Sequence, residues 1–589
     1  MWSVCFFLSL ITFILTVLFT VYAKYDKKKF SISSINILII GVFISSVIAF
    51  LPFYKHTFSS DGTLLKWFKT VLISIHHTIR IFIVDSDYES VKNVFGVLNG
   101  VLYNAYSGYL AVLYLIAPIL SFGMVLSFFK NVAAYRRYIF CYNKDVYVFS
   151  RLNEKSISLG ESISGMYKNS VIVYTGIQDQ DEDNTVFINK AKKAGAICFK
   201  KDLMSVNFKI HSRDSHIKFF MISENESDNV KLALSVVENY KNRDKTWIYV
   251  VSDEFEGEVI LSSIKTDKIK LRRISDVRTL VYSVLENTGH LLFEQALNVP
   301  EYENQKLISA LVVGAGKYGS EMIKSLAWFG QMNGYRLEIT AVDKRSDVKQ
   351  RFCASCPELM DEKFNNQFYD TGEAQYRIDL NSDIDVETID FYNFINRIKH
   401  ITYIFVDVGD DEFNIRTAIK LRSYLLKNGK SPRMQVVVHN PEKTKVLKGI
   451  TNHSGQSYDI DFVGDLNSLY SVGCIIDSAL EEEALLRHKK WGNEADFWKY
   501  EYNHRASIAS ALHRRMKALC KVPGIDKNPE ERTETERLNL RIMEHRRWNA
   551  YMRSEGYTYS PIRNNLAKTH NCLVTYDNLS DKEKAKDDD

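Results

Sequence analysis

A glycine-rich turn carries the clearest chemical motif in the chain. Gly314-Ala-Gly316-Lys-Tyr-Gly319 follows a strand-like apolar run and opens a helical pattern, and Asp343 ends the next apolar run. In this context the first glycine permits a tight turn, the second lets the backbone approach a pyrophosphate, and the acid accepts ribose hydroxyls. The motif predicts a Rossmann-type site that binds NAD or another nucleotide, and an empty, vestigial site is the alternative. The predicted ligand-binding residues are Gly314, Gly316, Gly319 and Asp343.

A second set of candidate ligand-binding residues lies near the C-terminus, in EHRRWNAYMRSEGYTY and the basic segment that follows it. Guanidinium groups bind phosphate through paired hydrogen bonds, and aromatic rings stack on bases. The candidates are Arg546, Arg547, Trp548, Tyr557, Tyr559, Arg563, Lys568 and His570. The alternative is structural, with the rings forming a small core and the cations forming a solvated helix face.

Catalytic and metal-binding patterns are missing from the sequence. It contains no GxSxG, Walker A, kinase or HExxH pattern, and Cys353-Ala-Ser-Cys356 is a CxxC without a second pair at zinc-finger spacing. We therefore predict no catalytic residues, no metal site and no enzymatic activity. A membrane-anchored NAD-dependent enzyme is the alternative that the glycine motif keeps open. The net charge of +5 is nearly balanced and the basic pairs are local, which predicts no nucleic-acid partner.

The elements that must position these residues follow from the hydrophobic pattern. With 589 residues, 46% of them hydrophobic, the chain has room for several domains. Apolar runs alternate with helical stretches from about residue 145, which predicts tandem α/β Rossmann-like domains at 140–300 and 305–475. A mostly α-helical domain is predicted at 478–589. The predicted strands are 145–150, 170–176, 217–223, 246–252, 309–316, 337–343, 401–409 and 434–440.

The two α/β domains are predicted to be copies of one unit. SENESDNVKLAL and VGDDEFNIRTAI each place an acidic turn after a strand, and they align Asn229 with Asn414. The copies differ in the turn after their first strand. Ser150, Leu152 and Lys155 stand at the glycine positions of the first copy, where their side chains obstruct a phosphate. The first copy is therefore not expected to bind a dinucleotide in the usual way.

The first 135 residues are predicted to be an α-helical transmembrane region. Three stretches, about 3–23, 32–54 and 106–129, are uncharged and long enough for helices across a bilayer core of about 30 Å. Basic clusters flank them, at 24–29 and 130–137. Because short basic loops stay in the cytoplasm, we expect a multi-pass inner-membrane protein with its N-terminus outside and its later domains cytoplasmic.

Polar residues in this region are pore candidates, because polar side chains at bilayer depth usually face a cavity or a partner. They are His76, His77, Asn104 and Ser107. The segment 64–84 mixes charged and apolar residues, which predicts an amphipathic interfacial helix or a pore-lining piece. No TVGYG filter is present, so the sequence predicts no particular ion. The alternative is that the helices only anchor a cytosolic protein.

Membrane spans followed by paired α/β domains, with VDVGDDEFNIRTAI in the second, resemble the regulator-of-potassium-conductance (RCK) and TrkA-N families. The resemblance covers 145–470. It implies paired Rossmann domains that assemble beneath a pore as a homo-oligomer, a tetramer in these families, and couple ligand binding to opening. It also implies that the nucleotide binds at the glycine motif and Asp343. The glycine positions of the first copy and the missing filter depart from the family pattern.

The segment 544–584 resembles the ryanodine-receptor (RyR) repeat in the succession EHRRWNAYMRSEGYTY, a basic linker and KTHNCLVTYDNLSDKEK. In bacteria this resemblance implies a sensor module, in some cases for nucleotide-derived signals in antiphage defence. The combined hypothesis is a ligand-gated ion channel or membrane-permeabilising effector controlled by a nucleotide-type ligand. Its partners would be membrane lipid, the nucleotide, inorganic ions and further copies of itself. A ligand-free membrane scaffold and an anchored NAD-dependent enzyme are the alternatives.

Overall fold

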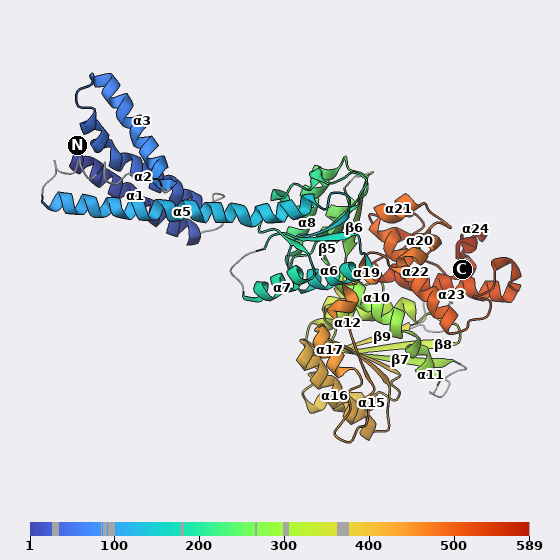
Figure 1. Ribbon diagram of the computed structural model, residues 1–589. Helices are drawn as coiled ribbons and strands as arrows, with labels where there is room; N and C mark the ends of the chain where they lie inside the picture. Colours follow the sequence, from blue (N-terminus) through green and yellow to red (C-terminus); the bar gives the residue numbers. More distant parts are fainter. Residues whose placement is uncertain are drawn as a thin grey trace. The chain divides into compact units, whose positions relative to one another are not determined.

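The computed structural model describes residues 1–25, 34–83, 85, 91, 100–177, 182–264, 268–297, 305–361 and 376–587. The chain divides into two compact units, Met1–Tyr138 and Ile139–Asp589 (Figure 1). The first unit is helical. The second contains two parallel sheets and a C-terminal helical region.

The described part of the first unit contains long helices. They are α1 (Trp2–Tyr25), α2 (Ser34–Thr57), α3 (Thr63–Phe82) and α5 (Val101–Ile139). The stretches Trp2–Tyr22, Ile37–Thr57 and Val101–Phe122 are long and apolar enough to cross a membrane, which indicates membrane association. They overlap the three predicted spans, and the third begins at Val101 instead of near 106. Lys27, Lys28 and Lys29, on which the predicted orientation partly depends, lie outside the described residues.

Close helix contacts and shared hydrogen bonds join α1, α2 and α5. The Tyr109 hydroxyl on α5 lies 2.8 Å from Ser9 Oγ on α1 and 2.5 Å from Ser45 Oγ on α2. A Cβ on Gly41 of α2 would lie only 2.1 Å from Thr16 Cγ2 of α1. Small residues let apolar helices approach, and hydrogen bonds between helices stabilise them where water does not compete. The packing of this unit therefore depends on a few small and hydroxyl-bearing residues.

Two six-stranded sheets form the centre of the second unit, and every strand pair in them is parallel. The first sheet has the order β3-β2-β1-β4-β5-β6 and the second β12-β11-β10-β7-β8-β9. Numbered within each copy, both follow the doubly wound order 3-2-1-4-5-6. The predicted pair of Rossmann-like sheets is confirmed.

The strands of the first sheet are β1 (Asp145–Phe149), β2 (Ser170–Tyr174), β3 (Ile197–Cys198), β4 (Ile217–Met221), β5 (Thr246–Val251) and β6 (Ile269–Ile274). The helices within and after this sheet in the chain are α6 (Glu154–Met166), α7 (Glu182–Lys193), α8 (Glu226–Tyr240), α9 (Phe255–Ser262), α10 (Asp276–Thr288) and α11 (His290–Ala296). The last of them, α11, packs against the second sheet. 

The strands of the second sheet are β7 (Lys306–Val313), β8 (Tyr335–Val342), β9 (Tyr376–Asn381), β10 (Tyr403–Val406), β11 (Arg433–Val437) and β12 (Ile460–Val463). The helices within and after this sheet in the chain are α12 (Lys317–Phe329), α13 (Val348–Ser355), α15 (Ile389–Arg397), α16 (Asp411–Lys427), α17 (Pro441–Leu447), α18 (Leu466–Leu469) and α19 (Val472–Ile475). The last two, α18 and α19, pack against α6 of the first α/β half. Alternate residues of β7 enter separate cores, Ala310 and Val312 on one face and Leu311 and Val313 on the other. Burial on both faces explains why central parallel strands are continuous apolar runs.

The four strands that the sequence did not predict, β3, β6, β9 and β12, are the edge strands of the two sheets. β3 has two residues and β12 has four. β9 alternates buried Tyr376, Ile378 and Leu380 with exposed Arg377 and Asp379. Edge strands are often short and carry charged residues, which blunts further strand pairing, so their apolar signal is weaker.

The predicted repeat appears as matching hydrogen bonds at two asparagines. Asn229 Oδ1 accepts from the backbone N–H of Ser223, and its amide donates to the carbonyl of Val251, the last residue of β5, at 2.8 and 3.0 Å. Asn414 makes the same two bonds, to the turn after β10 and to the last residue of β11, at 2.7 and 3.0 Å. Each asparagine thus joins the ends of two neighbouring strands in its own sheet.

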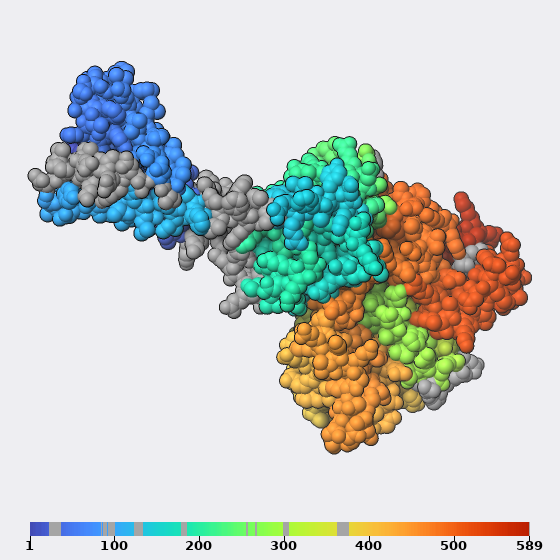
Figure 2. Space-filling view, in the orientation of Figure 1, coloured from blue at the N-terminus to red at the C-terminus, as the bar shows by residue number. Residues whose placement is uncertain are grey.

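The C-terminal helical region packs against both α/β halves. Its helices are α20 (Ala479–His488), α21 (Glu494–Lys499), α22 (Glu501–Leu519), α23 (Glu534–Ser554) and α24 (Asp581–Lys584), and its short strands are β13 (Thr558–Tyr559) and β14 (Thr569–His570). Arg272 of β6 pairs with Glu481 of α20 at 2.8 Å. Tyr551 of α23 meets Trp328 of α12 edge to face, with ring centroids 6.1 Å apart. Figure 2 shows this region, in orange and red, against the green segment 268–297.

Candidate nucleotide site

The glycine turn connects β7 to α12 at the carboxyl edge of the second sheet. Gly314 has φ +91°, and a Cβ there would lie 1.9 Å from the carbonyl oxygen of Asp407. A Cβ on Gly319 would lie 1.9 Å from the carbonyl oxygen of Gly314. Side chains at these two positions would clash with backbone, so the packing of the turn itself requires both glycines.

Gly316 is different, because the protein leaves space around it. Its φ is not positive, and the nearest atom to a Cβ there would be Asp407 Oδ2 at 4.0 Å. It stands immediately before the first turn of α12, where free backbone N–H groups and the helix dipole favour an anion. A glycine that internal packing does not require, at this position, suits close approach of a ligand phosphate to the backbone.

A cavity of about 420 Å³ lies over this turn, and we call it the nucleotide cavity. Of the four predicted residues, Gly314, Gly316 and Asp343 line it, and Gly319 lies buried behind it. Phe413 and Val386 add apolar surface. A cleft outside the carboxyl ends of the strands, beside the crossover between the two halves of the sheet, is where doubly wound folds bind ligands.

Asp343 is already held by the protein. Its Oδ2 accepts the backbone N–H of Ala315 at 2.9 Å, and its Oδ1 accepts the backbone N–H and Nε of Arg345 at 2.9 and 3.1 Å. Arg345 also donates to the carbonyl of Ala315 at 3.1 Å. Sequence reasoning did not select Arg345, although its place two residues after the acid was a usable signal. It brings a cation to the part of the cavity beside the glycine turn.

Asp407 is a second acidic residue that sequence reasoning missed. It follows β10 and lines the nucleotide cavity beside Gly316. Burial raises the pKa of its carboxyl group to about 6, Asp343 adds to the rise, and a hydrogen bond from Asn414 opposes it. Its carboxyl group therefore gains a proton in a mildly acidic range where an ordinary aspartate stays charged.

In the first copy, the protein's own side chains fill the equivalent turn. Leu152 is buried, and Asn153 caps α6 with a hydrogen bond from Ser156 N at 3.0 Å. Lys155 pairs with Asp276, which also accepts a hydrogen bond from the Tyr470 hydroxyl. Ser150 Oγ accepts the backbone N–H of Ile222 at 3.1 Å. The three residues at the glycine positions thus serve local packing and the contact between the two α/β halves.

The eight predicted residues near the C-terminus divide into two sets. Arg547, Trp548, Arg563 and His570 line a cavity of about 590 Å³, which we call the C-terminal cavity. The others do not line it. Arg546 donates to Asn333 Oδ1 at 3.3 Å, Lys568 donates to the carbonyl of Glu555 at 2.8 Å, Tyr557 packs against Tyr502, and Tyr559 is exposed.

Buried charge and aromatic rings characterise the C-terminal cavity. Arg547 is only 2% exposed and pairs with Glu544 at 2.9 Å, while its Nη1 is buried with no hydrogen-bond partner. Trp548 meets the ring of His570 edge to face at 4.9 Å and stacks on His545 at 5.8 Å. Glu544 and His545 were not among the sequence candidates. The cavity offers a ring face and a guanidinium, which suits a base and a phosphate.

The predicted pore residues do not gather at one place in the described part of the first unit. His77 is buried on α3, with Nδ1 2.8 Å from the Tyr54 hydroxyl and Nε2 2.5 Å from the Tyr114 hydroxyl. The other three lie apart from this contact: His76 and Asn104 are exposed, and Ser107 Oγ donates to the carbonyl of Asn104 at 3.2 Å.

Among the described residues, no group of three or more histidine, cysteine, aspartate or glutamate side chains could hold a metal ion. Cys356 of the CxxC pattern is buried, and burial raises the pKa of its thiol. No protein-family model and no curated protein matches the chain.

Proposed function

We propose that this protein is a membrane-anchored nucleotide sensor whose ligand-bound state controls a homo-oligomeric ion channel or membrane-permeabilising assembly. The ligand is NAD or another nucleotide, bound in the nucleotide cavity. The observation that carries the proposal is the open space at Gly316, at the start of α12 and in a cavity that Asp343 and Arg345 line. The resemblance to RCK and TrkA-N proteins supports the same site and favours a tetramer.

The three long apolar helices support placement in a membrane. The basic flanks favour an inner membrane, the N-terminus outside and the sheets in the cytoplasm. Coupling requires the nucleotide to bind one arrangement of the cytoplasmic domains more tightly than another, because only differential affinity shifts such an equilibrium. The RyR resemblance of the C-terminal helical region favours a role in antiphage defence, where membrane permeabilisation follows a nucleotide signal.

The C-terminal cavity is a second candidate for the sensor site. It is lined by Trp548 and by Arg547, whose buried Nη1 has no hydrogen-bond partner among the described residues. A nucleotide there would pair a phosphate with a guanidinium that the protein leaves incompletely satisfied. The two candidate sites are separate surfaces, so variants can distinguish them.

The test is thermal stability of the detergent-solubilised full chain against AMP, ADP, ATP, NAD, ADP-ribose and cyclic nucleotides. A ligand that binds only the folded state raises Tm by mass action. We expect at least one of these nucleotides to raise Tm and Gly316→Val to abolish the rise. If Trp548→Ala abolishes it and Gly316→Val does not, the sensor site is the C-terminal cavity.

The absence of any shift with every nucleotide would overturn the proposal. Membrane activity is tested separately, by ion release from liposomes that contain the purified chain, with and without the stabilising nucleotide. Release that is unchanged by the nucleotide would refute the coupling while leaving the binding site in place. Consumption of NAD by the purified protein would instead favour the enzyme alternative.

A further inference from the structure

A second cavity adjoins the nucleotide cavity, and Gly316, Lys317 and Arg345 line both. Its volume is about 440 Å³, and we call it the arginine cavity. Helices of the second sheet, α12 and α13, supply part of its lining, and Arg278 of α10 reaches it from the first α/β half. A ligand that crosses the glycine turn can therefore extend from one cavity into the other.

Most of the charged side chains that line the arginine cavity are basic. Six of its lining side chains are basic and three are acidic. Each of the three acids already pairs with a cation: Asp253 with Lys317 at 3.2 Å, Glu258 with Arg273 at 3.0 Å and Glu321 with Arg278 at 3.2 Å. Lys324 also lines the cavity, and the described residues give it no hydrogen bond or ion pair. Arg345 and Arg351 pair with Asp343 and Asp347, so Lys324 is the lining cation that remains to attract an anion.

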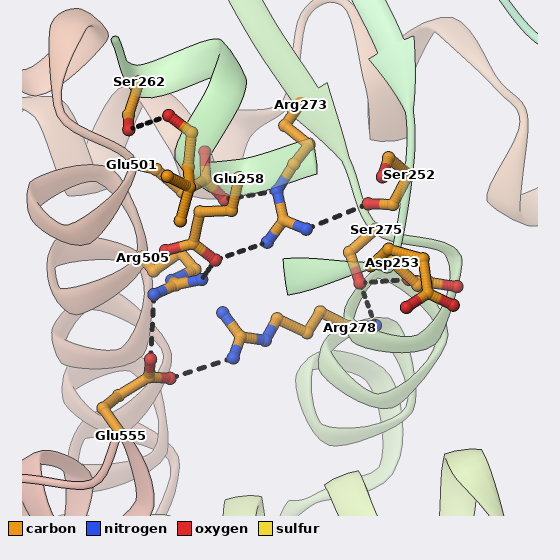
Figure 3. A network of polar contacts seen from close by, with 12 residues as sticks. Ser252, Asp253, Glu258, Ser262, Arg273, Ser275, Arg278, Glu501, Arg505 and Glu555 are labelled. Atoms are coloured by element: carbon orange, nitrogen blue, oxygen red, sulfur yellow. Dashed lines mark hydrogen bonds and ion pairs between the residues drawn. The ribbon is translucent and has the colours of Figure 1, made fainter. Parts of the chain in front are cut away.

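Arg278 connects the glycine-turn helix to the C-terminal helical region, and Figure 3 shows its contact with Glu555. Its Nε pairs with Glu321 of α12 at 3.2 Å, and its Nη2 pairs with Glu555, the residue after α23, at 3.0 Å. Its Nη1 is buried and has no hydrogen-bond partner. A phosphate presents the same oxygen geometry to a guanidinium as a carboxylate does, and it carries more charge.

Arg505 and Glu258 complete the connection. Arg505 of α22 pairs with Glu555 at 2.8 Å and with Glu258 of α9 at 2.6 Å (Figure 3). Glu555 is thus held by two arginines, one from the first α/β half and one from its own helical region. If the ion pair between Arg278 and Glu555 breaks, Arg505 still pairs with Glu555. The buried carboxylate therefore keeps one cationic partner.

We propose that the arginine cavity binds the distal phosphates of a nucleotide whose nucleoside lies in the nucleotide cavity, and that Arg278 then exchanges Glu555 for these phosphates. The ligand class is a nucleoside di- or triphosphate, because two or more phosphates are needed to occupy Gly316 and also reach Arg278 and Lys324, which line the arginine cavity alone. The exchange loosens the C-terminal helical region from α10. This inference rests on the proposed nucleotide site.

The first test compares the dissociation constants of AMP, ADP and ATP by calorimetry on the full chain in detergent, without divalent cations. We expect ATP to bind at least tenfold more tightly than AMP. Lys324→Ala should reduce the ratio of AMP to ATP dissociation constants about fivefold and leave AMP binding unchanged. Lys420→Ala is the matched control, an exposed lysine of α16 that lines neither cavity.

The second test measures amide hydrogen exchange in α22 and α23. ATP, but not AMP, should speed exchange at the end of α23 near Glu555. Arg278→Gln should show this faster exchange without any nucleotide and should lose the preference for ATP. Because Arg278 is partly buried and its loss can impair folding, Lys324→Ala serves as the variant that leaves the ion pairs intact.

Each outcome decides between the two proposals. If no nucleotide binds, the nucleotide site itself is refuted. If AMP and ATP bind equally, or if the ATP preference survives in both Lys324→Ala and Arg278→Gln, the role of the arginine cavity is refuted and the nucleotide site stands. If the preference depends on Lys324 but exchange in α23 does not change, the exchange of Glu555 for phosphate is refuted.

Discussion

Gly314 packs against the carbonyl oxygen of Asp407, where a Cβ would lie 1.9 Å away. This contact joins the glycine turn to the end of the neighbouring strand β10. A Cβ on Gly316, two residues later, would have its nearest neighbour, Asp407 Oδ2, 4.0 Å away. The packing of the turn therefore requires Gly314, whereas the space around Gly316 can accommodate a ligand.

This contrast predicts that alanine at Gly314 lowers stability, whereas alanine at Gly316 weakens ligand binding. Gly314→Ala should lower the free energy of unfolding by about 2 kcal/mol or more, because it forces a side chain into a positive-φ position against backbone. Gly316→Ala should change it by less than about 1 kcal/mol and weaken nucleotide binding at least tenfold. Thermal melting and ligand titration of the two variants check this. Equal loss of stability in both would contradict the assignment.

Asp407 predicts that nucleotide affinity depends on pH. The pKa of its buried carboxyl group is about 6, so the group is mostly charged at pH 7.5 and mostly protonated at pH 5.5. Protonation removes a negative charge beside the phosphates, and NAD should therefore bind more tightly as pH falls through 6. NAD is the suitable probe because its diester phosphates do not titrate in this range. Asp407→Asn should flatten the profile, and a profile that keeps its slope would exclude Asp407 as the cause.

Two buried histidines predict loss of stability in mild acid. Burial lowers the pKa values of His513 and His570 from 6.5 to about 4. Between pH 6.5 and 4 the unfolded chain binds these protons and the folded chain does not, so stability falls as pH decreases, by about 1.4 kcal/mol per pH unit for each histidine. Glu555, with a pKa of about 2, begins to contribute only at lower pH.

The measurement is Tm of the full chain at pH 7.5, 6.5 and 5.5, in the wild type and in His513→Gln. His513 Nε2 donates to the carbonyl of Gln331 at 2.8 Å, and the glutamine amide can replace this donor. The variant should lose less Tm than the wild type over this range. An identical decrease would show that His513 does not control the acid response.

The C-terminal cavity predicts that two of its lining arginines, Arg547 and Arg563, behave differently. Arg563 is exposed, so Arg563→Ala should leave Tm unchanged and weaken a nucleotide bound there about fivefold. Arg547→Ala should lower the free energy of unfolding by about 2 kcal/mol, because Glu544 loses a partner at 2.9 Å inside the protein. Arg537→Ala, at a half-buried arginine of α23 that does not line the cavity, is the control. Unchanged affinity in Arg563→Ala would argue against a ligand in this cavity.

Because α1 and α2 pack closely at Gly41, we predict that a larger side chain at this position is not tolerated. A Cβ there would lie 2.1 Å from Thr16 Cγ2, whereas a Cβ on Gly108 of α5 meets nothing within 4 Å. Gly41→Leu should separate the two helices and reduce the yield of monodisperse protein in detergent, and Gly108→Leu should be tolerated. Size-exclusion profiles compare the two. Equal yields would refute the observed packing of α1 against α2.

The sequence alone determined the features that come from local pattern. Apolar runs buried on both faces predicted the eight strands other than the edge strands, and Asn229 and Asn414 revealed the repeat. The glycine spacing predicted a nucleotide turn because its requirements are met within a few residues. Uncharged stretches predicted the three long apolar helices because length and composition are enough to recognise them.

Only the tertiary structure decided which distant side chains meet. Asp407 follows β10, more than ninety residues after the glycine turn that it contacts, and Arg278 and Glu555 come from α10 and from the end of α23. The same folding divided the eight C-terminal candidates, so that Trp548 lines a cavity while Arg546 contacts Asn333. Such contacts depend on how sheets and helices pack, and packing depends on the shape and burial of the whole unit. No local period or spacing in the chain encodes them.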